Sequence, residues 1–91
     1  MNLRTVKKDV DYMVNQVILE AFVAFHLTEE QKQQEEIVKV MNEAAILRED
    51  TFDLINHPDA EMKARKYFRH VMKAFFTSID KLIDKLDEFN N

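Results

Sequence analysis

The stretch Pro58–Phe89, PDAEMKARKYFRHVMKAFFTSIDKLIDKLDEF, carries the clearest helical pattern in the chain. Its apolar residues recur every three or four positions, which is the spacing of one face of an α-helix. Pro58 suits the first helical turn, because its missing N–H would have no partner there. We therefore predict a helix over about 58–89, whose apolar face consists of Ala64, Tyr67, Phe68, Val71, Met72, Phe75, Ile79, Leu82, Ile83, Leu86 and Phe89.

Two earlier segments show the same spacing and predict helices over about 5–26 and 29–56. Thr5 suits the N-cap of the first helix. Thr28 and Gln31 have the form of a capping box at the start of the second. The apolar positions are Val6, Val10, Met13, Val14, Val17, Ile18, Ala21, Phe22 and Phe25 in the first helix and Ile37, Val40, Met41, Ala44, Ala45, Leu47, Thr51, Phe52, Leu54 and Ile55 in the second.

The chain of 91 residues contains no glycine and only one proline. Glycine is the usual residue of tight hairpins and bulges, so its absence disfavours a β-sheet. Very short links make successive helices antiparallel. We predict an all-α fold, a single domain over 1–91 built as an antiparallel up-down-up three-helix bundle. A single rod bent at Pro58 is the alternative, but His57-Pro58 after Asn56 favours a reversal.

Composition narrows the possible partners and compartments. The chain has 13 Lys and Arg against 17 Asp and Glu, a formal net charge of -4, whereas nucleic-acid-binding proteins are usually basic. It has no cysteine for disulfides or thiolate ligands. The first residues carry charges of both signs, and the most apolar stretch, 17–27, is too short to cross a membrane. We expect a cytoplasmic protein with no membrane segment.

Signatures of catalysis and metal binding are absent from the sequence. The three histidines lie outside Glu-x-x-His and His-Glu-x-x-His patterns, and Asp53 with His57 supplies only two of the four ligands that zinc takes. Ser78, the only serine, has no strained nucleophile turn around it. We expect no enzymatic activity, no metal and no cofactor. We assign the remaining aromatic and sulfur side chains to the core rather than to a cofactor pocket: Phe22, Phe25, Met72, Phe75 and Phe76.

The first helix has more apolar surface than a three-helix bundle needs. Tyr12, Leu19 and Val23 align on the side opposite its apolar face, with Gln16 between them, and we call these four residues the outer strip. A two-fold axis would cover it with an identical strip. The sequence therefore predicts a homodimer centred near Leu19, or a groove for a partner protein. The alternatives are a helix wedged between the other two, or ordinary scattered apolar surface.

Arg48 interrupts the apolar face of the second helix. A charge buried alone is very unfavourable, so its guanidinium needs a partner or must reach solvent. Asp11 lies at the edge of the first helix's apolar face, near the same level of the bundle. We predict a buried ion pair between Arg48 and Asp11, with Glu49 outside it. The alternative is an arginine that holds the carboxylate of a ligand.

Six basic residues and no acid occupy 63–73. We call Lys63, Lys66, Arg69 and Lys73 the basic patch. An antiparallel neighbour would set its first members beside Glu49, Asp50 and Asp53, and neutralisation there favours a solvated outer face.

We expect a small non-enzymatic helical protein that acts by self-association or by binding a partner protein, and no nucleic-acid partner. The alternative is a small nucleic-acid-associated or regulatory module that uses the basic patch.

Overall fold

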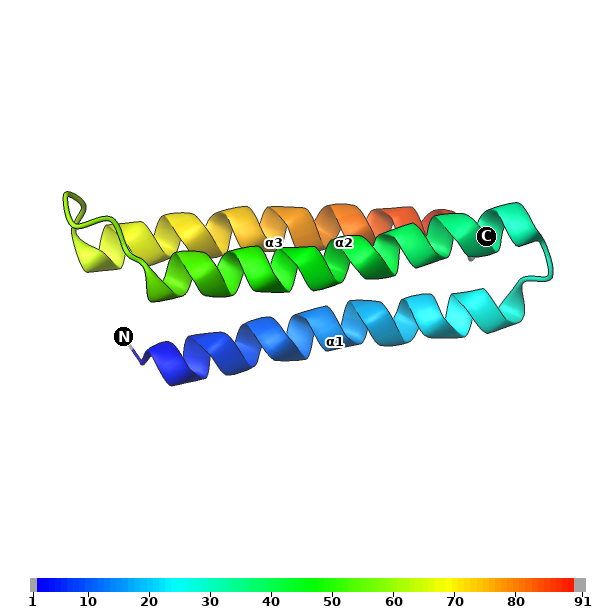
Figure 1. The fold of residues 1–91 in the computed structure, drawn as a ribbon, viewed down its shortest axis with the longest axis horizontal. Helices are drawn as coiled ribbons and strands as arrows, with labels where there is room; N and C mark the ends of the chain where they lie inside the picture. Colours follow the sequence, from blue (N-terminus) through cyan, green and yellow to red (C-terminus); the bar gives the residue numbers. More distant parts are fainter. Residues whose placement is uncertain (1, 90–91) are drawn as a thin grey trace.

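The computed structural model describes residues 2–89 and consists of three long helices lying side by side (Figure 1). Helix α1 spans Leu3–Leu27, α2 spans Gln31–Asn56 and α3 spans Ala64–Phe89. Each helix contacts both of the others, in a bundle that measures 50 × 19 × 18 Å. The predicted all-α, up-down-up three-helix bundle is therefore confirmed, and residues 2–89 contain no strand.

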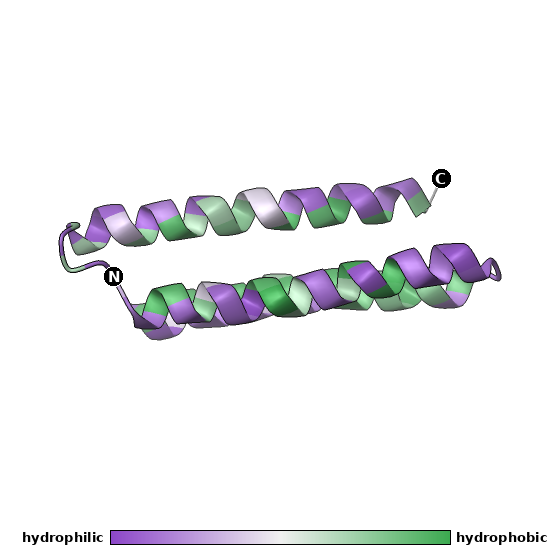
Figure 2. Ribbon diagram, turned by 45° about the horizontal axis from the view of Figure 1, so that its top comes forward, coloured by the Kyte–Doolittle hydropathy of each residue, from purple (hydrophilic) through white to green (hydrophobic). Residues whose placement is uncertain are grey.

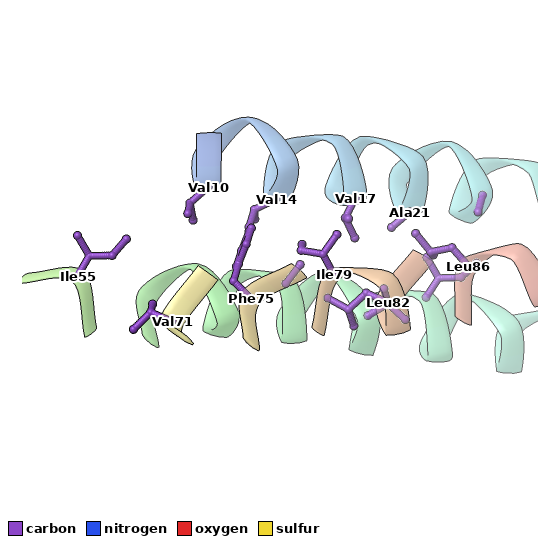
Figure 3. Packing of buried hydrophobic residues seen from close by; sticks show 14 of the residues in the cluster. Val10, Val14, Val17, Ala21, Ile55, Val71, Phe75, Ile79, Leu82 and Leu86 are labelled. Atoms are coloured by element: carbon purple, nitrogen blue, oxygen red, sulfur yellow. The ribbon is translucent and has the colours of Figure 1, made fainter. Parts of the chain in front are cut away.

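The core lies along the axis where the three apolar faces meet. In Figure 2 the hydrophobic positions of α3, the upper helix, gather on the side that faces the other two helices. Val14 and Val17 of α1 point toward Phe75 and Ile79 of α3, and all four are at most 5% exposed (Figure 3). Short side chains on α1 let the long side chains of α3 reach the axis, which gives close packing without voids. Burying a side chain of this size stabilises the fold by about 1.5–3 kcal/mol.

Several residues of the predicted apolar faces lie outside this core, because spacing alone does not define how wide the buried sector of a helix is. The exposed members are Phe22, Ala45, Leu54 and Ala64, and Phe76, assigned to the core as an aromatic side chain, is exposed as well. Their assignment to the core is wrong.

Helix α1 begins two residues earlier than predicted. The side chain of Asn2 accepts hydrogen bonds from the backbone N–H groups of Arg4, at 3.0 Å, and Thr5, at 3.4 Å. Asn2 is thus the N-cap, and asparagine is among the best residues for that position. Thr5, which we expected to be the cap, lies within the first turn of the helix.

The link between α1 and α2 uses Thr28 differently from the predicted capping box. Helix α2 begins at Gln31, and the backbone N–H of Glu30 donates to Thr28 Oγ1 at 3.2 Å. The Thr28 hydroxyl donates to Gln33 Oε1 at 2.8 Å, and Gln34 Nε2 donates to the Thr28 carbonyl at 3.0 Å. Gln33 and Gln34, rather than Gln31, therefore hold the connection, and Gln34 also satisfies carbonyl groups at the end of α1, because its Nε2 lies 3.5 Å from the Phe25 carbonyl oxygen as well.

The link between α2 and α3 is longer than predicted and occupies 57–63. Pro58 lies in this link, so its assignment to the first turn of α3 is wrong. A turn follows it, in which the N–H of Glu61 donates to Asp59 Oδ1 at 2.9 Å and the N–H of Met62 donates to the Asp59 carbonyl at 3.2 Å. The axes of packed helices are about 8–10 Å apart, and a residue advances the chain by at most about 3.6 Å, so the single residue His57 could not make the reversal.

Tyr67 ties the start of α3 to the end of α2. Its ring is 8% exposed, and its hydroxyl lies 2.8 Å from the carbonyl oxygen of Leu54 and 3.3 Å from that of His57. Carbonyl groups in the last turn of a helix have no partner within the helix. The Tyr67 hydroxyl supplies one, and so fixes how α3 begins against α2.

We predict that Tyr67→Phe lowers the free energy of unfolding by about 1–2 kcal/mol, because it keeps the ring but leaves a carbonyl without its donor. Urea denaturation at fixed protein concentration measures the change. Tyr12→Phe is the matched control, since Tyr12 is 65% exposed, and its effect should stay within about 0.5 kcal/mol. Equal effects of the two substitutions would contradict this role of the Tyr67 hydroxyl.

Candidate interaction surfaces

The outer strip lies on the side of α1 that points away from the core. Tyr12 is 65% exposed, Leu19 56% and Val23 48%, and Gln16 is also exposed. These fractions exclude the alternative in which α1 is wedged between α2 and α3 with the strip covered on both sides. The strip is therefore apolar surface that no part of residues 2–89 buries.

Two further residues widen this surface toward the end of α1. Phe22 is 52% exposed and Leu27 is 77% exposed. The Phe22 ring packs edge-on against His26, with 4.4 Å between the ring centroids, instead of entering the core. We call the five apolar residues on this side of the helix the α1 face: Tyr12, Leu19, Phe22, Val23 and Leu27.

A shallow groove of about 260 Å³ runs along one margin of the α1 face, between α1 and α3. Tyr12 and Gln16 line it from α1, and Phe76 and Ile83 line it from α3. Phe76 is 42% exposed. Ligand pockets for small molecules usually measure about 300–1,000 Å³ and are strongly concave, so this groove resembles the edge of an interface more than a ligand pocket.

The structure brings Arg48 and Asp11 together. Arg48 Nε donates to Asp11 Oδ1, and Arg48 Nη1 lies 3.9 Å from Glu49 Oε1. The guanidinium also lies 4.4 Å from the centroid of the Phe52 ring, within range of a cation–π interaction. The Arg48 side chain is 37% exposed and that of Asp11 is 41% exposed, so the expectation of a buried pair is wrong. The pair lies at the edge of the α1–α2 contact, where the long stem of arginine can reach water.

The neighbourhood of Arg48 does not favour a ligand carboxylate. A surface groove of about 400 Å³ adjoins the guanidinium, and Glu49 and Asp50 also line it. Two carboxylates beside this opening, together with Asp11, would repel another anion. The contacts therefore fit a structural arginine better than a ligand-binding one.

We predict that Arg48→Met changes the free energy of unfolding by less than about 0.5 kcal/mol, because methionine keeps the apolar stem and the lost pair is partly solvated. Asp11→Ala should lower stability by more, about 0.5–1 kcal/mol, because it leaves the arginine without its nearest carboxylate. Thermal unfolding of the two single variants and the double variant measures the coupling. The expectation fails if Arg48→Met is the more damaging substitution.

The four residues of the basic patch lie on the outside of the bundle. All are exposed, and among residues 2–89 none forms an ion pair. The expected neutralisation by α2 is not observed, since Glu49 lies near Arg48, and Asp53 pairs with His57 at 3.1 Å. The expectation assumed a helix that starts at Pro58, whereas α3 starts at Ala64 after the 57–63 link, which changes the register between α2 and α3.

No set of three metal-ligating side chains converges within residues 2–89. In the same part of the chain, no helix combines the length and apolar character needed to cross a membrane. No protein-family model, curated protein or solved structure matches the chain.

Proposed function

We propose that this protein is non-enzymatic and acts by self-association, with the α1 face of one copy packed against the α1 face of another. The observation that supports this most is the exposure of the α1 face, whose five large apolar side chains are 48–77% exposed on one helix. Leaving apolar area in water is unfavourable by about 25 cal/mol per Å². Large exposed apolar side chains gathered on one helix are typical of a protein–protein contact.

The spacing along α1 favours a second copy as the occupant. Tyr12, Gln16, Leu19, Val23 and His26 follow one another at intervals of four, three, four and three residues, which is the repeat of a coiled-coil seam. In an antiparallel pair with its two-fold axis at Leu19, the two Leu19 side chains meet. Tyr12 then faces His26 of the second copy, because each lies seven residues from Leu19.

A partner protein with an amphipathic helix is the other occupant that would suit this face. Helix-in-groove recognition uses anchors at the same three- and four-residue spacings. A second copy is preferred because Tyr12 and His26 lie at equal distances on either side of Leu19, whereas a foreign helix requires no such symmetry.

We predict that the unmodified protein is a homodimer at tens of micromolar and that Leu19→Glu weakens the dimer at least about ten-fold, which is 1.4 kcal/mol. The substitution puts two carboxylates on the axis of the interface. Sedimentation equilibrium measures the mass, and circular dichroism should show unchanged helix content.

Ile46→Glu is the matched control, because Ile46 is an exposed apolar residue of α2, at 59%, outside the α1 face. It should leave the dimer intact. A monomeric mass for the unmodified protein at this concentration would defeat the proposal and leave the α1 face to a different partner.

The alternative function, nucleic-acid association through the basic patch, has one observation in its favour, namely that these side chains have no ion-pair partner within residues 2–89. The net charge of -4 opposes it.

We predict that duplex DNA or RNA binds no more tightly than the non-specific range, about 10⁻⁴ to 10⁻⁶ M at physiological salt. Fluorescence anisotropy with labelled duplexes measures the affinity. Sub-micromolar binding that Lys66→Glu abolishes would instead support the nucleic-acid function.

A further inference from the structure

The exposed side of α3 divides into a basic half and an acidic half. Its first part carries Arg65, Lys66, Arg69 and Lys73, and its last part carries Asp80, Asp84, Asp87 and Glu88, all of them exposed. The two lysines in the acidic half lie toward α2, where Lys85 pairs with Glu43 at 3.1 Å and Lys81 lines the α2–α3 groove. The outward-facing charges are therefore segregated along the helix, and none of the eight forms an ion pair within residues 2–89.

This distribution opposes the stability of α3 itself. Cations near a helix N-terminus and anions near its C-terminus interact unfavourably with the helix dipole, and α3 has Arg65 and Lys66 in its first turn and Asp87 near its end. Like charges four residues apart also repel, as Arg69 and Lys73 do. Local helix stability therefore does not account for the pattern, whereas an oppositely charged surface laid along α3 would.

The charged side of α3 is complementary to the same side of an antiparallel copy of α3. Lys73 and Asp80 lie at equal distances on either side of the point between Phe76 and Thr77. The same holds for Arg69 with Asp84, and for Lys66 with Asp87. With a rise of 1.5 Å per residue, the members of the three pairs lie about 5, 11 and 16 Å from that point along the helix axis. With a rotation of 100° per residue, all six side chains fall within a sector of about 60° of the helix circumference.

We propose that the charged side of α3 binds the same side of a second copy, antiparallel, about a two-fold axis between Phe76 and Thr77. Lys66, Arg69 and Lys73 of each copy then face Asp87, Asp84 and Asp80 of the other, so that three kinds of ion pair each occur twice.

The centre of this contact suits close approach of two helices. Phe76 is 42% exposed and supplies apolar area at the axis. The Thr77 hydroxyl already donates to the Lys73 carbonyl at 3.0 Å, so burying it leaves no unsatisfied donor.

A second copy explains both halves of α3, whereas nucleic acid explains only one. The phosphate backbone would be attracted to the basic half but repelled by the three aspartates and Glu88. The contact uses a different helix from the proposed pairing through α1, but Phe76 and Asp80 share a groove with Tyr12 and Gln16, so its test must be made with the α1 pairing removed. It should be salt-sensitive, since exposed ion pairs are individually weak and are screened by salt.

A charge-exchange experiment tests the contact. Among the six pairing residues, one variant, Arg69→Glu with Lys73→Glu, leaves Lys66 as the single cation, and a second, Asp80→Lys with Asp84→Lys, leaves Asp87 as the single anion. Both also carry Leu19→Glu, which removes the proposed α1 contact. We expect each variant alone to self-associate at least about ten-fold more weakly than the Leu19→Glu parent, and the two mixed to form a one-to-one complex.

Sedimentation velocity at 20 mM and 500 mM salt measures the association, and the mixed complex should be lost at the higher salt. Lys8→Glu with Lys32→Glu, on α1 and α2, is the control for net charge and should associate like the parent. Two variants that stay separate at low salt would overturn the proposal. A parent that remains dimeric at 500 mM salt would contradict the placing of Leu19 at the centre of the α1 pairing, whereas the mixing result tests the α3 contact.

Discussion

The structure depends on one steric constraint, which is that α1 approaches the other helices closely only because its inward side carries valines and alanines. Val10, Val14, Val17, Ala21 and Ala24 are at most 4% exposed. The space left along the axis accommodates the long side chains of α3, among them Phe75 and Leu86. An inward side this narrow uses only part of the circumference of α1. The apolar surplus on the opposite side is therefore a direct consequence of how the core is packed.

The α1 face and the outer side of α3 are two surfaces with different physical character. The α1 face is apolar, so the association proposed for it would be driven by removal of area from water and would be insensitive to moderate salt. The outer side of α3 is charged, and its interactions weaken as ionic strength rises. The chain thus has one surface suited to a contact that salt would hardly change and another suited to a contact that salt would weaken.

Much of the fold could be predicted from spacing alone, because three long amphipathic patterns with no glycine between them allow few architectures. The Arg48–Asp11 contact could also be inferred, since a charge on an apolar face requires a partner. Spacing could not define the width of each buried sector, which is why Phe22 and Phe76 were assigned to the core. It also could not locate the start of α3, because that depends on the reach of the 57–63 link and on the Tyr67 hydroxyl, which are tertiary features.

The geometry of the two faces limits what the protein can build. A contact through a two-fold axis closes on itself, so a chain with only one such face stops at a dimer. A chain that used both proposed contacts, on α1 and on α3, would give every copy two neighbours. The assembly then either closes into a small ring or grows, depending on the angle between the axes. Because only the α3 contact depends on salt, ionic strength would set how far assembly proceeds beyond the α1 dimer.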